Sequence, residues 1–464
     1  SQVGVVVADA STGETVYDHN GNDRAVPASN NKLQTSAAAV GILGEDYTFG
    51  TDVASESKPV DGTLADDLYL RGTGDPTMLA EDYDDLAKQL ADAGVTTVDG
   101  DLVADDTAYD PQPLGAEWGW DDLPYYYAAE ISALNVAPDD EFDAGSVQID
   151  VTPGAEGEAA KVKVTPANDY VSIDNQTSTS VAGSDLSISI DRGNGSNEIT
   201  VSGDIPSDSE GYQDLSSVSG PTGYAADVFG KALADNGITV KGDVRIGETT
   251  VDGAKSLAGH ESMPLSEMLV PFLKLSNNGH AETLTKAIGV EMAGEGSFEA
   301  GTAAIQDFVA DLGVDTDQVQ QVDGSGMSRQ NLIPPAQMVK LLAGAHEADW
   351  FKAWYNALPI ACQDDQMVGG TLRSRLCDTP AAENLHGKTG SMTSVSALSG
   401  YVTDGDGRDL VFSVMNNDFK GDVKDLEDEI AATIAATSES SSISETKIDV
   451  PQPGNPAPSD KECS

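Results

Sequence analysis

Hydrophobic residues near both ends of the chain follow the patterns of one mixed α/β domain. Residues 3–8 (VGVVVA) and 14–17 flank a turn that contains Gly13, and together they predict a β-hairpin. The Ala-rich run at 32–40 predicts a helix that ends at the glycines following it. Further helices are predicted at 264–275, 280–292, 297–312, 335–346 and 423–437, and further strands at 394–403 and 409–415.

The middle of the chain, from 51 to 257, has a different pattern. A helical stretch, a glycine and a strand follow one another at 86–105 and again at 228–247, which indicates two related units. Between them, at 145–203, polar and apolar residues alternate in short runs such as VQIDV and EITVSG. This alternation predicts short antiparallel strands with one solvated face. The middle region is therefore expected to form inserted units of its own.

The charge of the chain changes the expected surface. Its 464 residues include 78 acidic and 25 basic ones, so the formal net charge is −53. Such an excess repels itself in dilute buffer and is screened by salt. We interpret it as an adaptation to high salt, with an ordinary acidic secreted protein as the alternative. The few scattered basic residues argue against a nucleic-acid partner, and no run of about 18 apolar residues predicts a membrane span.

Cysteine is scarce, and the end of the chain has a low-complexity composition. Cys362, Cys377 and Cys463 are too few for a disulfide scaffold and lack the spacing of a zinc site. Cys362 and Cys377 could bridge a loop in an oxidising compartment or remain free, and the sequence leaves both open. No metal or cofactor site is predicted. The Ser/Pro-rich segment 438–464 is predicted to be disordered.

Ser29 and Lys32 are the first candidates for chemistry. At the start of a helix, residues three apart share a face, so the amine of Lys32 can reach the hydroxyl of Ser29. A serine needs a base to become a nucleophile, and a desolvated lysine with a lowered pKa can serve. The alternative is that Ser29 only caps the helix. The spacing recurs at 55–58 and 444–447, but only Ser29 follows a proline and begins an Ala-rich helix.

Two further polar motifs complete a pattern. Residues 276–278 (SNN) follow an apolar stretch, and residues 388–391 (KTGS) precede a predicted strand. Either motif alone could be an ordinary polar loop. In the order SxxK, SxN and KTG, however, the three motifs form the signature of penicillin-binding proteins and serine β-lactamases.

Beyond these motifs, the chain resembles the S13 peptidase family, the class C low-molecular-mass penicillin-binding proteins, over about 1–437. The matching stretches include PASNNKLQTSAAAVGILGEDYTF, LYLRGTGDPT, LSNNGHAETLTKAIG, VDGSGMSRQNLIPP, GGTLRSRL and HGKTGSMTSVSALSGYV. The resemblance implies a β-lactamase/transpeptidase-like α/β (α+β) domain with two nested, mainly β inserted domains. The expected catalytic domain comprises 1–50 and 258–437, one inserted domain 51–75 and 145–257, and the other 76–144. The acidic composition, the tail and the two nearby cysteines depart from the family pattern.

The resemblance assigns the reacting groups. Ser29 would be the acylated nucleophile, and Lys32 the base that takes its proton. Ser276 would relay that proton to the leaving amine, because a hydroxyl both accepts and donates. Asn278 would hold Lys32 and the substrate amide.

The third motif would bind the substrate. Lys388 would supply positive charge near the terminal carboxylate, and the hydroxyl of Thr389 would hydrogen-bond to it. Gly390 would let the edge strand approach the substrate closely. The backbone N–H groups of Ser29 and Ser391 would form the oxyanion hole. This Ser–Lys chemistry needs no histidine, and the two histidines beside the motifs, at 280 and 386, are interpreted as structural.

A further hypothesis concerns the substrate side chain. The aromatic cluster at 118–127 lies in the insertion, where the family's inserted region borders the cleft. We expect an apolar channel with a carboxylate and a guanidinium at its far end, which would bind the amine and the carboxylate of a zwitterionic D-amino-acid terminus. The residues expected to form it are Trp118, Asp121, Tyr126, Met327, Arg329 and Met392. The alternative is that the aromatic residues form an inter-domain core and that Arg329 makes a surface ion pair.

The function implied by the resemblance is that of a serine DD-peptidase. It would cleave D-Ala-D-Ala-type bonds through a Ser29 acyl-enzyme as a carboxypeptidase, with endopeptidase activity as an additional option. Peptides ending in a D-amino acid would be its substrates, and β-lactams its covalent inhibitors. The alternatives are a serine β-lactamase or esterase, for which no dedicated deacylating glutamate is identified, and a penicillin-binding protein without turnover. We expect an extracellular or cell-envelope location, with any leader absent from this sequence.

Overall fold

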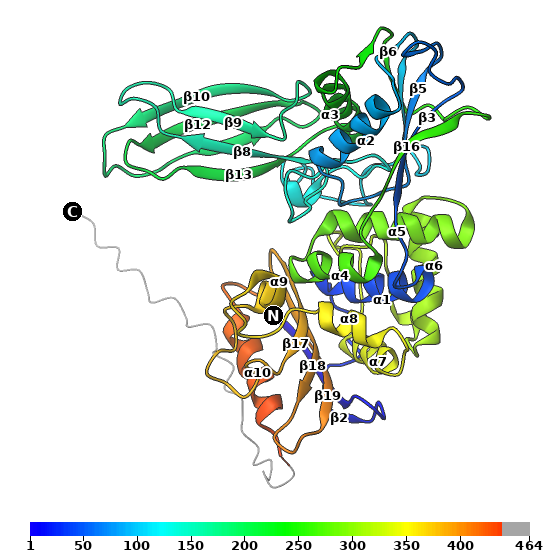
Figure 1. Cartoon of the computed structure of the whole chain (residues 1–464). Helices are drawn as coiled ribbons and strands as arrows, with labels where there is room; N and C mark the ends of the chain where they lie inside the picture. Colours follow the sequence, from blue (N-terminus) through cyan, green and yellow to red (C-terminus); the bar gives the residue numbers. More distant parts are fainter. Residues whose placement is uncertain (439–464) are drawn as a thin grey trace.

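The two ends of the chain meet in one antiparallel sheet of five strands, ordered β17-β18-β19-β1-β2 (Figure 1). The computed structural model describes residues 1–438. Strand β1 pairs with β19, with Val5 opposite Val414, so the first strand is held by the last. The predicted N-terminal hairpin is confirmed. The strands are β1 (Gln2–Asp9), β2 (Thr15–His19), β17 (His386–Met392), β18 (Val395–Thr403) and β19 (Asp409–Asn417).

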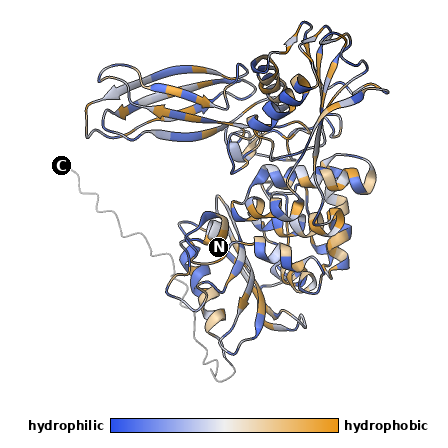
Figure 2. Ribbon diagram, viewed as in Figure 1, coloured by the Kyte–Doolittle hydropathy of each residue, from blue (hydrophilic) through white to orange (hydrophobic). Residues whose placement is uncertain are grey.

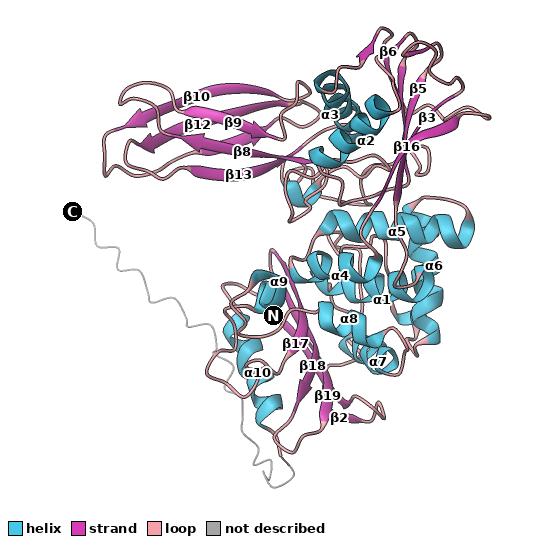
Figure 3. Ribbon diagram, viewed as in Figure 1, coloured by secondary structure: helices cyan, strands magenta, loops and turns pink. Residues whose placement is uncertain are grey.

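Helices cover both faces of this sheet (Figure 3). Along β18, Ala397 and Tyr401 join the core formed with α1 and α7, whereas Leu398 and Val402 pack with α10. Such alternation is what a pleated strand between two layers requires. The predicted helices are confirmed, and α8 and the short α9 add two that the pattern did not indicate. The helices of this domain are α1 (Lys32–Leu43), α4 (Leu265–Lys274), α5 (Asn278–Ala293), α6 (Phe298–Asp311), α7 (Pro335–His346), α8 (Phe351–Ala357), α9 (Gln366–Gly369) and α10 (Lys424–Ala436).

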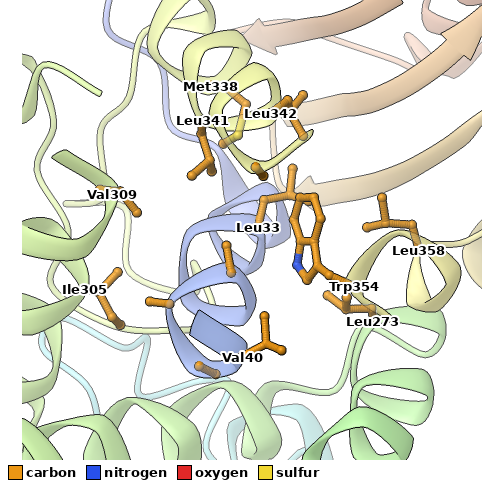
Figure 4. Packing of buried hydrophobic residues seen from close by; sticks show 14 of the residues in the cluster. Leu33, Val40, Leu273, Ile305, Val309, Met338, Leu341, Leu342, Trp354 and Leu358 are labelled. Carbon is orange, nitrogen blue, oxygen red and sulfur yellow. The ribbon is translucent and has the colours of Figure 1, made fainter. Parts of the chain in front are cut away.

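Helix α1 lies at the centre of the largest core (Figure 4). Nine consecutive residues from Lys32 to Val40 are buried, which explains why the helix is rich in alanine rather than amphipathic. Leu33 and Val40 pack among side chains of α4, α6, α7 and α8. The indole N–H of Trp354 on α8 donates to the hydroxyl of Ser36 at 2.7 Å. The helix is thus a rigid platform for the residues at its start.

The inserted region begins with a second five-stranded sheet, ordered β15-β7-β5-β3-β16, and two helices packed on it. The two related units predicted at 86–105 and 228–247 lie side by side here, with β6 parallel to β14 and β7 parallel to β15. The elements are β3 (Gly50–Ser55), β4 (Thr63–Leu64), β5 (Leu68–Gly72), α2 (Ala80–Asp92), β6 (Thr97–Val98), β7 (Leu102–Asp105), α3 (Pro221–Asp235), β14 (Thr239–Val240), β15 (Val244–Ile246) and β16 (Lys255–Glu261).

An elongated β unit projects from this part of the molecule (Figure 1). It consists of the sheets β13-β8-β9 and β10-β12-β11. Hydrophobic and hydrophilic residues alternate along its strands (Figure 2), as the sequence indicated. The expected antiparallel pairing is wrong for one pair, because β10 and β12 run parallel. Alternation of polar and apolar residues indicates that one face of a strand is buried, but it does not indicate the direction in which the strand pairs. The strands are β8 (Ser146–Thr152), β9 (Lys161–Thr165), β10 (Ser172–Ser180), β11 (Ser189–Arg192), β12 (Glu198–Pro206) and β13 (Tyr212–Ser217).

The sheets group the insertion differently from the predicted ranges. Strand β7 and helix α2 fall within the expected separate domain 76–144, yet β7 pairs with β5, and α2 shares a core with α3. The projecting β unit is confined to 146–217. Parallel pairing between segments about 140 residues apart caused this difference, because it depends on tertiary contacts rather than on local pattern.

Three remaining expectations concern the C-terminal half and the tail. Cys362 and Cys377 form a disulfide, so the structure settles the choice that the sequence left open. The described chain, 1–438, contains no helix long and apolar enough to cross a membrane and no group of three or more residues arranged as a metal site. The tail that was predicted to be disordered lies, apart from residue 438, outside the described residues.

Candidate active site

Ser29 sits in a short 3-10 turn (Ala28–Asn31) directly before α1. The helix starts at Lys32, and Asn31, not Ser29, occupies the cap position, without a side-chain cap bond. The alternative that Ser29 is a helix cap is therefore wrong. Its hydroxyl instead accepts a hydrogen bond from Nζ of Lys32 at 2.9 Å, as the spacing predicted.

Lys32 is fully buried and makes three hydrogen bonds. Besides Ser29, its Nζ donates to Oδ1 of Asn278 at 2.6 Å and to the carbonyl oxygen of Ser325 at 2.9 Å. Burial lowers the pKa of Lys32 to about 7, although Glu282 and Asp323 act in the opposite direction. Near neutral pH a large fraction of this lysine is thus an unprotonated amine, which can accept the proton of Ser29.

The second motif forms the junction between α4 and α5. Ser276 has a left-handed backbone, with φ of 63°, a strained conformation for a residue with a side chain. Asn277 accepts from the backbone N–H of His280 and caps α5, while its Nδ2 donates to Phe142 and Asp143 of the insertion. These contacts on both sides hold Ser276 in its unusual conformation.

Asn278 joins the insertion to the nucleophile. Its Oδ1 accepts from Lys32, as expected, and its Nδ2 donates to the carbonyl oxygen of Tyr127 at 2.8 Å. The amide donor that was expected to hold the substrate is therefore engaged by the protein.

The third motif lies within strand β17 and directly precedes β18, the strand that was predicted at 394–403. Nζ of the fully buried Lys388 donates to the hydroxyl of Ser276 at 2.8 Å and to the carbonyl of Thr389 at 2.7 Å. Burial, and then the charge of Lys32, lowers the pKa of Lys388 well below its ordinary value. The charge of Lys32 therefore disfavours the charged form of Lys388.

Gly390 sets the distance between β17 and the nucleophile. A Cβ at this position would lie 2.5 Å from the carbonyl oxygen of Pro27 and 3.1 Å from the backbone nitrogen of Ser29. Only a glycine allows this approach, which packs β17 directly against the backbone of Pro27 and Ser29. The backbone N–H groups of Ser29 and Ser391 remain the donors expected to stabilise an oxyanion.

Glu282 is a site residue that the motifs did not reveal. It is fully buried on α5, and its two oxygens accept the backbone N–H groups of Gly324 (2.7 Å) and Ser325 (2.8 Å). Because the carbonyl of Ser325 accepts from Lys32, Glu282 positions one of the three partners of the base. Burial and the nearby Asp323 raise the pKa of Glu282. The sequence signal that could have indicated Glu282 is its position, since it is a charged residue one turn after the SxN motif on a buried helix.

Comparison with known proteins agrees with this geometry. The model of the D-Ala-D-Ala carboxypeptidase 3 (S13) family matches residues 1–438. The chain belongs to the S13 family. It is 47% identical over 435 residues to a D-alanyl-D-alanine carboxypeptidase of Actinomadura sp. (strain R39), covering 93% of this chain and 81% of the relative. It is 27% identical over 430 residues to D-alanyl-D-alanine carboxypeptidase DacB of Haemophilus influenzae, covering 91% and 87%.

Solved structures extend the family relation to the fold. The crystal structure of penicillin binding protein 4 (dacB) from Haemophilus influenzae matches with a TM-score of 0.80 at 25% identity, covering 93% of this chain and 96% of that one. The same protein complexed with a β-lactam matches with a TM-score of 0.74, covering 93% and 95%. The expected transpeptidase-like fold with additional β-rich parts is confirmed.

The structure of this S13 member separates the residues of the expected side-chain channel. The indole N–H of Trp118 donates to Asp323 at 3.1 Å, so this ring is tied to the loop that also holds Lys32. Within residues 1–438 Arg329 makes no surface ion pair; its guanidinium donates to the carbonyl of Thr393 at 2.5 Å. Tyr126 instead lines a hollow together with residues of α4 and of the short 3-10 helix η4 (Gly370–Leu372). Asp121 is exposed, and Met327 and Met392 are half-buried.

The two histidines beside the S13 motifs have structural contacts. His280 is buried, with Nε2 3.1 Å from the carbonyl of Phe142, and burial lowers its pKa to about 4. His386 stacks on Tyr355 with ring centroids 4.1 Å apart, and burial lowers its pKa to about 4 as well. Both rings are therefore neutral near pH 7, in keeping with the structural role that was expected.

Proposed function

We propose that this S13 enzyme cleaves the peptide bond before a C-terminal D-amino acid through an acyl-enzyme on Ser29. The observation that carries the proposal is the buried Lys32, whose amine lies 2.9 Å from the Ser29 hydroxyl and whose pKa is lowered to about 7. A serine becomes nucleophilic when an adjacent base takes its proton. The match of the S13 family model to 1–438 supports the same reaction.

In the first half of the reaction, Nζ of Lys32 takes the proton of Ser29 as Oγ attacks the substrate carbonyl. The N–H groups of Ser29 and Ser391 stabilise the negative oxygen of the tetrahedral intermediate. When the C–N bond breaks, Ser276 gives its hydroxyl proton to the leaving amine and takes in exchange the proton that Lys32 removed from Ser29; the Ser276 hydroxyl also lies 2.8 Å from Nζ of Lys388. Water then hydrolyses the ester and regenerates Ser29.

Lys388 and Thr389 recognise the carboxylate of the leaving residue. The approach of an anion favours the charged form of a lysine, so substrate binding would protonate Lys388 while Lys32 stays neutral. The half-buried Thr389 donates its hydroxyl to that of Thr371 at 2.7 Å. The carboxylate of a β-lactam would occupy the same place, and its strained amide would acylate Ser29.

The test of this function is covalent labelling of Ser29. We expect one equivalent of a penicillin to add to the wild-type protein and none to Ser29→Ala, measured by intact mass. Ser55→Ala is the matched control, since residues 55–58 have the same SxxK spacing and Ser55 is buried. Labelling that persists in Ser29→Ala would contradict the proposal. It would also be contradicted if enzyme that a penicillin does label releases no D-alanine from any D-Ala-D-Ala peptide.

The acyl side of the substrate is proposed to lie beside Arg329, with Trp118, Met327 and Met392 nearby. Arg329 reaches Thr393, which follows β17 at the end opposite Lys388. Its guanidinium is exposed and keeps donors free for a substrate carboxylate. Asp121 would pair with an amine of the same side chain, whereas Tyr126 does not belong to this group.

Arg329→Ala is expected to lower kcat/KM by about tenfold for peptides whose acyl side chain ends in a carboxylate, the loss of one charge-assisted hydrogen bond. Penicillin acylation should remain nearly unchanged. Arg24→Ala is the control, because Arg24 also donates to a backbone carbonyl on the surface. Equal losses for both substrate types would give Arg329 a structural role.

An envelope or extracellular location is the last part of the proposal. The Cys362–Cys377 disulfide supports it, since such bonds persist in oxidising compartments. Fractionation of the source cells, followed by labelling with a penicillin that does not cross membranes, would test it. Labelled protein found only after lysis would contradict this location.

A further inference from the structure

We propose that a hollow on the leaving side of the scissile bond binds a long side chain of the leaving residue, ending in a carboxylate, as in one strand of a peptide cross-link. The inference rests on the proposed function and adds a subsite to it. The hollow has a volume of about 400 Å³ and lies between the insertion and the catalytic domain. We call it the leaving-side hollow; it is lined by Tyr126, Glu141, Asp143, Lys274, Leu275, Gln366, Gly370, Thr371, Arg373 and Ser374.

Two catalytic groups place this hollow on the leaving side. Thr371, in its lining, lies 2.7 Å from the hydroxyl of Thr389, which binds the carboxylate of the leaving residue. Ser276, which protonates the leaving amine, directly follows the lining residue Leu275. The residues assigned to the acyl side, Arg329 among them, are not in the lining. A side chain on the leaving residue therefore points toward this space.

The size of the leaving-side hollow exceeds what D-alanine needs. Ligand sites in proteins range from about 300 to 1,000 Å³, and a methyl group would leave nearly all of this one to water. A longer side chain would displace that water and extend between the insertion and the catalytic domain.

The polar lining indicates the chemistry of that side chain. Arg373 is exposed, and within residues 1–438 no ion pair or side-chain hydrogen bond engages its guanidinium. What distinguishes Arg373 is its place in the lining of the hollow, where a free guanidinium suits recognition of a ligand carboxylate.

The other charged groups of the lining each make a hydrogen bond within the protein. Nζ of Lys274 donates to the carbonyl of Leu358, and Asn277 donates to Asp143. Glu141 accepts from Gln366 through Oε1 and keeps its second oxygen for a peptide N–H. Arg373 is thus the group that selects an anionic side chain.

The test compares three peptides that share the acyl part and differ in the leaving residue: D-alanine, D-norleucine and D-2-aminoadipate. We expect the wild-type enzyme to prefer D-2-aminoadipate over D-norleucine. Arg373→Ala should lower kcat/KM for D-2-aminoadipate about tenfold, the loss of one charge-assisted hydrogen bond, and leave the D-alanine peptide unchanged. Arg373→Lys should restore part of the loss.

Arg71→Ala is the matched control, because Arg71 is also exposed and without a side-chain partner within 1–438, but lies on β5 of the insertion. Equal kcat/KM for D-norleucine and D-2-aminoadipate, or an unchanged preference in Arg373→Ala, would overturn the subsite while leaving the proposed function intact. No cleavage of any of the three peptides would overturn the proposed function and the subsite with it.

Discussion

Lys32 is held between two opposing electrostatic effects. Burial removes the solvation of the ammonium form, while Glu282 and Asp323 favour that form, and burial is the larger effect. The resulting pKa of about 7 makes a base that is mostly neutral above pH 7 and still accepts a proton during the reaction. The rate of Ser29 acylation should therefore rise as the pH rises through about 7.

Glu282→Gln should shift this rise to lower pH. The substitution removes a carboxylate that raises the pKa of Lys32, so the neutral amine would persist in more acidic solution. An amide has only one acceptor oxygen for the N–H groups of Gly324 and Ser325, so the plateau rate should also fall, by about tenfold. The pH dependence of the second-order acylation rate by a penicillin measures both effects.

Glu291→Gln is the matched control for this prediction, because Glu291 lies on the same helix and is exposed. If the pH profile of the acylation rate has the same midpoint in Glu282→Gln as in the wild type, Glu282 affects only the fold and not the pKa of Lys32.

At the level of elements, the active site is the contact between the start of α1 and the edge strand β17. The loop between α4 and α5 adds Ser276 and Asn278, and the disulfide between Cys362 and Cys377 closes the segment that carries α9 and η4 (Gly370–Leu372). The close approach at Gly390 is what turns these separate elements into one cleft.

Gly390→Ala should slow acylation about 100-fold, because a displacement of about 1 Å at a reacting centre has an effect of that order. The added Cβ would lie 2.5 Å from the carbonyl of Pro27, and β17 would have to move away from Ser29. Stopped-flow acylation rates and circular dichroism would measure the loss and the intact fold. In Gly230→Ala on α3, where the new Cβ meets no atom within 4 Å, the rate should not change. Full activity of Gly390→Ala would mean that β17 can adapt.

At the level of the whole molecule, the insertion completes the active site. Tyr127 binds Asn278, Trp118 binds Asp323, and Phe142 binds Asn277, so three points of one long loop meet the catalytic domain. The net charge of −53 also affects the whole molecule, because acidic residues are spread over both the catalytic domain and the insertion.

The melting temperature should rise between dilute and molar KCl. Salt shortens the Debye length from about 10 Å at 0.1 M to about 3 Å at 1 M and so screens the repulsion between acidic side chains. Thermal unfolding followed by circular dichroism gives the Tm at each concentration. Sucrose is the non-ionic control, since it strengthens burial without screening charge. A Tm indifferent to KCl would favour the ordinary acidic protein over the salt-adapted one.

The sequence by itself determined the contact between Ser29 and Lys32 and the local elements around it. Ser29 and Lys32 were predicted from a three-residue spacing on a helix, which fixes their contact whatever surrounds them. The helices and the terminal hairpin followed from local periodicity, which senses the burial of one face. These features depend on neighbours in sequence, and the structure agrees with them.

Only the tertiary structure decided the features that depend on distant segments. The parallel pairing of β7 with β15 regrouped the insertion, and the parallel pair β10–β12 replaced an expected antiparallel one. Glu282 became a site residue because Gly324 and Ser325 fold onto it, and Tyr126 lines a hollow with residues of α4 and η4, away from Arg329. A pattern along the chain records which faces are buried, whereas the partner that buries each face is chosen by packing in three dimensions.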